Sequence, residues 1–250
     1  MSSQTKKINV MAHMIPFYPG KEIAEAAVAG LVEGGATHLE IQFPFSDPTA
    51  DGPTIQAACS RALEQGFRVD AGFEFVRRAA DTHHLPIFIM SYASLVYARG
   101  VQRFAGDARA AGAAGLIVPD LPVDADEGLY QAAAAEGLEI WPVVVPNTPP
   151  ERIEIIRDIK PRGVYAALRA GITGTKTEIG EDNLEFLDHL QGLEAPVFAG
   201  FGIREREQVQ ALAPHVDGIV IGSAFVEIIA RSTREDVAQN LRDFLQGLLV

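Results

Sequence analysis

The chain has 250 residues, 48% of them hydrophobic, and a formal net charge of −12. The 5 lysines and 16 arginines form no basic stripe, which argues against nucleic-acid binding, and no apolar run nears the ~20 residues that a membrane span needs. The single cysteine, Cys59, excludes a disulfide framework, and the polar segment Met1–Lys7 lacks a signal-peptide core, so we expect a cytoplasmic protein. The length suits one large core, and we expect residues 1–250 to form a single domain.

Eight short apolar runs alternate with longer amphipathic segments along the chain. Such near-continuous apolar runs are typical of parallel strands that are buried on both faces. The predicted strands are Ile8–Met14, Thr37–Phe43, Pro86–Met90, Gly115–Val118, Leu138–Val145, Gly163–Leu168, Pro196–Gly200 and Gly218–Ile221.

Between these runs, apolar residues recur at helical spacing. The predicted helices are Lys21–Glu33, Pro53–Glu64, Asp70–Thr82, Val101–Ala111, Ala125–Glu136, Pro150–Asp158, Glu181–Leu190, Arg204–Leu212 and Ala224–Leu249. Eight strand–helix repeats predict an α/β fold, a (β/α)8 TIM barrel with an extra helix after the second strand. A doubly wound open sheet is the alternative, but it usually has fewer strands in this length.

Three carboxylates at the second predicted strand are the first candidates for a site. Glu40 lies inside an apolar run, and Asp47 and Asp51 follow in a turn rich in proline and glycine. A carboxylate between apolar neighbours loses hydration, which favours its protonated form and allows it to donate and accept protons near neutral pH. A buried carboxylate facing more exposed ones can divide acid and base roles.

Each of these carboxylates also has a purely structural explanation. Glu40 would then pair with an arginine or point outward. Aspartates at positions 47 and 51 are typical of turns, and Asp51 would cap a helix that begins at Pro53.

Two glycine-containing loops predict a phosphate site. Gly200–Gly202 follows the seventh predicted strand, and Gly222 with Ser223 ends the eighth and opens the last helix. Amides at a helix N-terminus bind anions, and the loops after strands seven and eight are the frequent phosphate site of this fold. The alternative is that these glycines serve only turns. The long polar segment Ala170–Gly180 is either a lid or a simple connection.

Other chemistries find no support in the residues. The six histidines show no metal-ligand spacing, no lysine ends an apolar strand as a Schiff-base aldolase would require, and Cys59 has no nearby histidine. Acid–base chemistry on a phosphorylated substrate remains, without a cofactor or metal.

The residues of these segments resemble a known family. Glu40, the P-F-S-D-P sequence at 44–48 and A-D-G-P-T-I-Q at 50–56 are similar to the signature of the tryptophan synthase alpha subunit. The resemblance continues through 119–122, 169–174, 200–203 and 222–223. It implies cleavage of indole-3-glycerol phosphate to indole and glyceraldehyde 3-phosphate in tryptophan biosynthesis. A free-standing lyase of the same chemistry and a non-catalytic activator of a beta subunit are the alternatives.

The resemblance also implies roles for individual residues. Glu40 would move protons at the ring carbon and at the glycerol hydroxyl, and Asp51 would accept the indole N–H. The substrate-binding residues would be Tyr165, Thr173 and Phe201, and the phosphate cradle would be Gly174, Gly202, Gly222 and Ser223.

A partner and several departures complete the comparison with this family. The implied partner is a PLP-dependent beta subunit in an αββα complex, which would meet Pro44–Gly52 and Pro119–Pro122. Gln42 stands where the family commonly has glycine, the segment from His13 to Gly20 replaces a form nearer T-x-G-D-P, and Leu168 replaces a usual serine. The chain also starts close to its first strand, so we expect the family's N-terminal helix to be largely missing.

Overall fold

The structure, a computed structural model, describes residues 8–168, 179–200 and 202–249. Every one of the eight predicted apolar runs contains a parallel strand, which confirms the strand predictions. The strands are β1 (Asn9–Met14), β2 (His38–Gln42), β3 (Ile87–Met90), β4 (Gly115–Ile117), β5 (Glu139–Ile140), β6 (Val143–Val144), β7 (Val164–Ala167), β8 (Val197–Gly200) and β9 (Gly218–Ile221).

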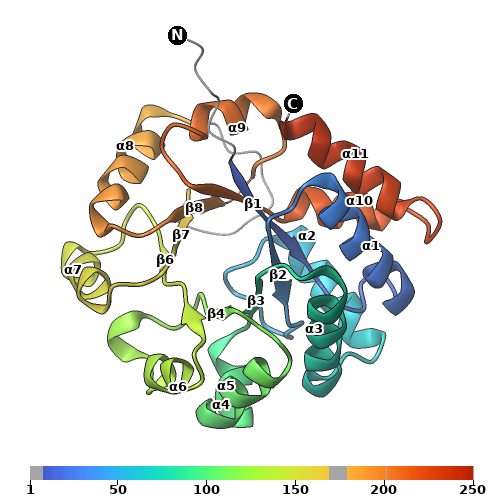
Figure 1. Cartoon of the computed structure of the whole chain (residues 1–250), viewed down its shortest axis with the longest axis horizontal. Coiled ribbons are helices and arrows are strands. Elements are labelled where there is room, and N and C mark those ends of the chain that lie inside the picture. Colours follow the sequence, from blue (N-terminus) through green and yellow to red (C-terminus); the bar gives the residue numbers. More distant parts are fainter. Residues whose placement is uncertain (1–7, 169–178, 201, 250) are drawn as a thin grey trace.

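The sheet closes into a barrel through one interrupted strand. Its order is β5-β4-β3-β2-β1-β9-β8-β7-β6, and only Trp141 and Pro142 separate β5 from β6 along the chain. The Trp141 amide donates to the Leu116 carbonyl at 3.1 Å, and the Tyr165 amide donates to the Pro142 carbonyl at 3.0 Å. The segment of residues 139–144 therefore forms hydrogen bonds with β4 on one side and with β7 on the other. Pro142 has no amide hydrogen to donate, and it interrupts the strand between β5 and β6. Figure 1 shows the resulting ring, which confirms the (β/α)8 barrel.

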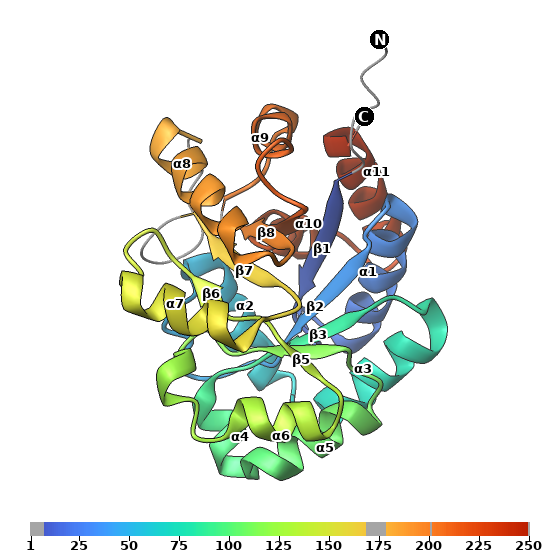
Figure 2. The same ribbon diagram turned by 60° about the vertical axis from the view of Figure 1, so that its left-hand side comes forward.

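Helices surround this barrel, and Figure 2 shows strands passing between α1 and α3 on one side and α7 and α8 on the other. The pair α2 and α3 confirms the extra helix after the second strand. The helices are α1 (Lys21–Gly34), α2 (Pro53–Glu64), α3 (Val69–His83), α4 (Ala93–Arg99), α5 (Val101–Ala110), α6 (Leu129–Ala135), α7 (Pro150–Ile159), α8 (Glu181–Leu190), α9 (Arg206–Leu212), α10 (Ser223–Arg231) and α11 (Val237–Leu249), with short 3-10 turns η1 (Val123–Ala125) and η2 (Gln191–Leu193).

In the middle of the chain, the structure contains one helix that was not predicted and one helix that begins later than predicted. Helix α4 was not predicted, because it is short and buries only two of its residues, Ala93 and Val96. The helix predicted to begin at Ala125 begins at Leu129 instead, after the left-handed Gly128, and the Asp126 carboxylate accepts the Tyr130 amide at 2.7 Å.

The last predicted helix, Ala224–Leu249, is divided into α10 and α11. The backbone adopts an extended conformation at Ser232, which ends α10. The Asp236 carboxylate then accepts the Thr233 amide at 2.8 Å in the turn before α11. The expectation of a missing N-terminal helix falls on residues 1–7, which lie outside the described residues. Within the described ranges, no helix combines the length and the apolar character needed to cross a membrane.

Aromatic side chains fill the end of the barrel where the strands begin. Trp141 lies 4.4 Å from Phe88 and 4.8 Å from Phe198 between ring centroids, and His38 packs against all three rings. Gly163 provides the necessary room, because a Cβ there would lie 2.2 Å from the Trp141 ring. This packing fills the N-terminal end of the barrel, and the cavity that Glu40 and Asp51 line lies at the end where the strands terminate.

Candidate active site

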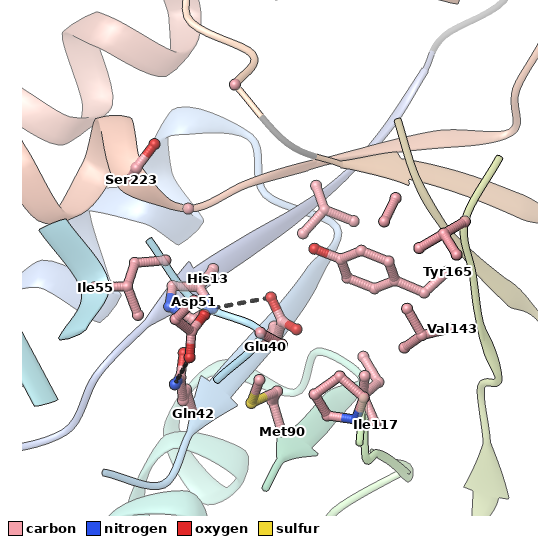
Figure 3. Close-up of a pocket in the computed structure, with 17 residues that line it drawn as sticks. His13, Glu40, Gln42, Asp51, Ile55, Met90, Ile117, Val143, Tyr165 and Ser223 are labelled. Carbon is pink, nitrogen blue, oxygen red and sulfur yellow. Dashed lines mark hydrogen bonds and ion pairs between the residues drawn. The ribbon is translucent and has the colours of Figure 1, made fainter. Parts of the chain in front are cut away.

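A cavity at the carboxyl ends of the strands brings most of the predicted site residues together (Figure 3). Glu40, Asp51, Tyr165, Gly202, Gly222 and Ser223 all line it. Its lining also includes residues that the sequence interpretation did not select for a site, among them His13, Met90, Ile117 and Val143. Thr173, Gly174 and Phe201 lie outside the described residues.

Glu40 lies in the middle of the cavity wall and is paired with a histidine. It is 3% exposed on β2, and the parallel register places it directly opposite His13 on β1, which is 4% exposed. Nδ1 of His13 lies 3.0 Å from Oε2 of Glu40, and we assign the ring nitrogen as the donor. The expected alternatives, an arginine partner or an outward-facing side chain, are therefore wrong.

The His13 imidazole is electrostatically biased toward its charged form. Burial by itself lowers the pKa of this ring, but the carboxylates of Glu40 and Asp51 outweigh burial, so that the pKa of His13 is raised above its ordinary value. The structure thus places next to Glu40 a buried imidazole whose protonated form is favoured.

Asp51 is not the more exposed carboxylate that the sequence suggested. It is 4% exposed, because the Tyr92 hydroxyl donates to Oδ2 at 2.7 Å and the Gln42 amide donates to the same atom at 2.6 Å. Burial raises the pKa of Asp51, and these two hydrogen bonds oppose the rise. Among the described residues, both bonds reach Oδ2, which leaves Oδ1 for a ligand.

The helix-cap explanation for Asp51 is also wrong. Helix α2 begins at Pro53 as predicted, but Gly52 occupies the cap position and no side chain caps the helix. Asp47, in contrast, is exposed on the same loop, as expected for a residue outside the site.

Tyr92 is a site residue whose role the sequence did not reveal. Its side chain is fully buried, its hydroxyl accepts the Ala50 amide at 3.1 Å, and its ring stacks on Phe45 with centroids 5.4 Å apart. Because the same hydroxyl donates to Asp51, one side chain fixes both the backbone and the carboxylate of this loop.

The rim near α10 forms a polar concave surface. Ser223 is the first residue of α10 and is 6% exposed, and Gly202 has φ +78°, a conformation that favours glycine. The Gln208 amide donates to the Gly202 carbonyl at 3.0 Å and supports this turn. Arg204 donates to the Ser223 hydroxyl at 3.1 Å and pairs with Glu227 at 2.6 Å. The start of α10 thus lines one end of the cavity, and amides at a helix N-terminus are groups that bind anions.

The remaining wall of the cavity is apolar apart from one tyrosine. Tyr165 on β7 packs over Gly200, where a Cβ would lie 2.7 Å from the tyrosine hydroxyl oxygen. Burial raises the pKa of Tyr165 well above its ordinary value. Figure 3 shows its hydroxyl and the Glu40 carboxylate facing the same space, beside Met90, Ile117 and Val143. A flat apolar group fits this wall.

Cys59 lies inside α2, as the sequence predicted, and its surroundings do not suit a thiol nucleophile. It is fully buried, and burial raises its pKa to about 12, so the reactive thiolate is scarce at neutral pH. In the described part of the chain, no group of three or more side chains could hold a metal ion.

The fold and the site together define a TIM-barrel enzyme of the acid–base class. Comparisons with known proteins then identify its family. The family model described as "Tryptophan synthase alpha chain" matches residues 1–247. The tryptophan synthase alpha chain of Helicobacter hepaticus is 39% identical over 99% of this chain and 95% of its own length, and that of Gloeobacter violaceus is 37% identical over 94% and 87%.

Solved structures agree with this match. Tryptophan synthase from Mycobacterium tuberculosis has a TM-score of 0.89 at 31% identity, over 98% of this chain and 92% of that one. The tryptophan synthase complex from Pyrococcus furiosus has a TM-score of 0.89 at 32% identity, over 98% and 99%. The chain belongs to the tryptophan synthase alpha chain family, which confirms the resemblance and makes it a lyase of tryptophan biosynthesis.

Proposed function

We propose that the chain cleaves indole-3-glycerol phosphate to indole and glyceraldehyde 3-phosphate in the cavity lined by Glu40 and Asp51. The observation that carries the proposal is that two buried carboxylates, each with one oxygen already bonded, face one cavity with an anion-accepting rim. A substrate with a phosphate at one end and an indole ring at the other matches this layout.

The phosphate is proposed to lie at Gly202, Gly222 and Ser223, against the N-terminus of α10. The indole ring would then lie on the apolar wall beside Tyr165, within reach of Asp51. Thr173, Gly174 and Phe201 are proposed to complete the substrate and phosphate contacts.

The proposed chemistry is a retro-aldol cleavage. Glu40 takes the proton of the hydroxyl on the glycerol carbon attached to the ring and gives a proton to the ring carbon that carries the side chain. The bond between that ring carbon and the glycerol carbon breaks, leaving indole and an aldehyde, so that one proton is lost and one is gained. Asp51 accepts the indole N–H and stabilises the positive charge that builds up on the protonated ring.

The chain is proposed to work without a cofactor of its own and in the cytoplasm. No lysine lines the described part of the cavity, so no amine is placed there to form a Schiff base with a carbonyl substrate or with PLP. PLP is expected only on a partner beta subunit.

The proposed partner is a tryptophan synthase beta subunit. One similar structure describes the mutual activation of the tryptophan synthase α2β2 complex from Pyrococcus furiosus, and it matches this chain with a TM-score of 0.89 at 31% identity. We propose the same assembly for this chain, with Pro44–Gly52 and Pro119–Pro122 at the contact.

The decisive assay is indole release from indole-3-glycerol phosphate, with and without a beta subunit. Glu40→Gln is expected to reduce turnover by about 10²–10⁴-fold, the usual contribution of a general acid–base group, with little loss of substrate affinity. Glu64→Gln is the matched control, because Glu64 is an exposed residue of α2 that pairs only with Arg61 among the described residues. Normal turnover in Glu40→Gln would remove Glu40 from the mechanism.

Asp51→Asn tests the second carboxylate in the same assay. Most of the activity should be lost, because a neutral amide cannot stabilise the charge on the ring. A variant with normal turnover and only an altered melting temperature would show that Asp51 is structural.

A further inference from the structure

Two buried polar atoms have no hydrogen-bond partner within the described part of the chain, His13 Nε2 and Gln42 Oε1. Each belongs to a side chain whose other polar atom bonds one of the two carboxylates of the site. Buried polar groups without partners are costly, so their presence at a functional site needs an explanation. His13 provides the stronger case, because it adds a charge as well as a hydrogen bond.

The position of the His13 ring is fixed on several sides. The β1–β2 register holds it opposite Glu40, and Nδ1 lies 3.0 Å from Oε2. On another side the ring lies against Gly222, where a Cβ would be 3.5 Å from its carbon atoms. A ring held in this way constrains the carboxylate that it contacts.

His13 is also the only side chain able to carry a positive charge among the described residues that line the cavity. The titratable groups that act on it are Glu40 on β2 and Asp51 in the loop before α2, and Tyr165 on β7 lines the same cavity. Two carboxylates in one small cavity repel each other and favour protonation, unless a cation lies between them.

We propose that His13 is a positioning residue that orients Glu40 through Oε2, leaves Oε1 for the substrate, and sets a protonated imidazole against this carboxylate. The inference rests on the proposed function of Glu40 and adds a group to it. His13 keeps its own proton throughout the reaction, so no further proton donor or acceptor is needed. The hydrogen bond and the charge of the imidazole make separate contributions, and two variants separate them.

His13→Phe removes both contributions and keeps a ring of similar size. We expect kcat to fall by about 10–100-fold with KM changed less than about threefold, because the orientation of Glu40 acts on the chemical step. The acidic limb of the kcat/KM profile should move to higher pH by one unit or more, because a buried carboxylate without a cationic neighbour ionises less readily.

His13→Asn keeps a hydrogen-bond donor near the position of Nδ1 but carries no charge. It should recover most of kcat at alkaline pH, while its acidic limb stays shifted like that of His13→Phe. His215→Asn is the matched control, since His215 forms a histidine–carboxylate pair with Asp188 at 2.6 Å outside the cavity. That variant should keep the rate and the pH profile of the original chain.

A measurement that needs no activity tests the pair directly. In ¹⁵N-histidine NMR, the ring signals of His13, assigned by their loss in His13→Asn, should titrate above 6.5 in the original chain and at least one pH unit lower in Glu40→Gln. This experiment remains informative if His13→Phe fails to fold.

The outcomes separate the two proposals. An original chain that releases no indole but shows the Glu40-dependent titration refutes the proposed function and supports the pair. Normal indole release with an unshifted acidic limb in both His13 variants, or a His13 titration that does not change in Glu40→Gln, overturns the role of His13.

Discussion

At the scale of single residues, the site depends on side chains that hold the carboxylates from behind. Glu40 is held by His13, and Asp51 is held by Tyr92 and Gln42. Because each of these bonds uses one carboxylate oxygen, the other oxygen keeps a defined direction toward the cavity. Orientation of this kind is a large part of how enzymes lower a barrier.

Tyr92→Phe tests this support at Asp51. The variant loses the hydroxyl that donates to Asp51 and accepts the Ala50 amide, so one buried carboxylate and one half-buried amide lose a partner. We expect a loss of about 1–3 kcal/mol in the free energy of unfolding. Turnover should also fall, by about tenfold or more. Urea unfolding and the indole assay measure the two effects.

Tyr97→Phe is the control for Tyr92→Phe, because Tyr97 lies on the next helix and is 40% exposed. Its unfolding free energy and its turnover, measured on the isolated chain, should match those of the original. If both tyrosine variants behave alike, the Tyr92 hydroxyl has no special role at Asp51.

The residues that the sequence interpretation missed share a physical reason. His13 and Glu40 are 27 positions apart, and only the register of β1 with β2 brings them together. A search for metal-ligand spacing cannot find a histidine that pairs with one carboxylate. Tyr92 is likewise 41 positions from Asp51. Local patterns predicted the carboxylates, but their supports are set by tertiary contacts.

At the scale of elements, the strands were the most predictable part of the chain. Parallel strands buried on both faces need continuous apolar runs, and these are visible without any alignment. Helix ends were harder, because they depend on local hydrogen bonds between a side chain and the backbone, such as those of Asp126 and Asp236, inside a longer helical pattern. The predicted strand Leu138–Val145 is divided at Pro142, because a proline has no amide hydrogen for the hydrogen bonds of a sheet.

The contact between α1 and α11 offers a prediction about element packing. A Cβ on Gly30 would lie 2.4 Å from the backbone oxygen of Ala238, which cannot move away without shifting α11. Gly30→Ala should therefore lower the free energy of unfolding by about 1–3 kcal/mol, as overpacking does elsewhere. The kcat of the folded fraction should stay unchanged, since neither residue lines the cavity.

Gly247→Ala in the same helix pair is the contrasting variant. Gly247 lies inside α11, and no atom lies within 4 Å of the place that a methyl group would occupy, so alanine meets no obstacle there. It should raise the free energy of unfolding by about 0.5–1 kcal/mol through helix propensity. Equal effects of both substitutions would mean that the close approach at Gly30 is not rigid.

At the scale of the whole molecule, the buried ionisable groups predict how stability depends on pH. The pKa of His13 is raised in the folded chain, so its contribution is fully present below about 6.5, the usual value for histidine, and is lost as pH rises through the folded value. The pKa of Asp51 is raised too. Its contribution to the free energy of unfolding is fully present below about 3.8, the usual value for aspartate, and is lost as pH rises through the folded value.

We therefore expect the free energy of unfolding to decline as pH rises from about 6.5 through the raised pKa of His13, by at most about 1.4 kcal/mol per pH unit for one proton. Urea titrations across this range measure the decline, and His13→Asn should reduce its slope. A slope that is the same with and without His13 would assign the decline to other groups. The single-domain organisation of residues 1–250 stays a prediction.

The interruption at Trp141 and Pro142 has a consequence for how the activity is distributed along the chain. The part before it carries His13, Glu40 and Asp51, and the part after it carries Tyr165, Gly202 and Ser223. The proposed residues for proton transfer and those for anion recognition thus belong to separate halves of the polypeptide. Two fragments divided at this point would each hold half of the function, and indole release would report their reassembly into one barrel.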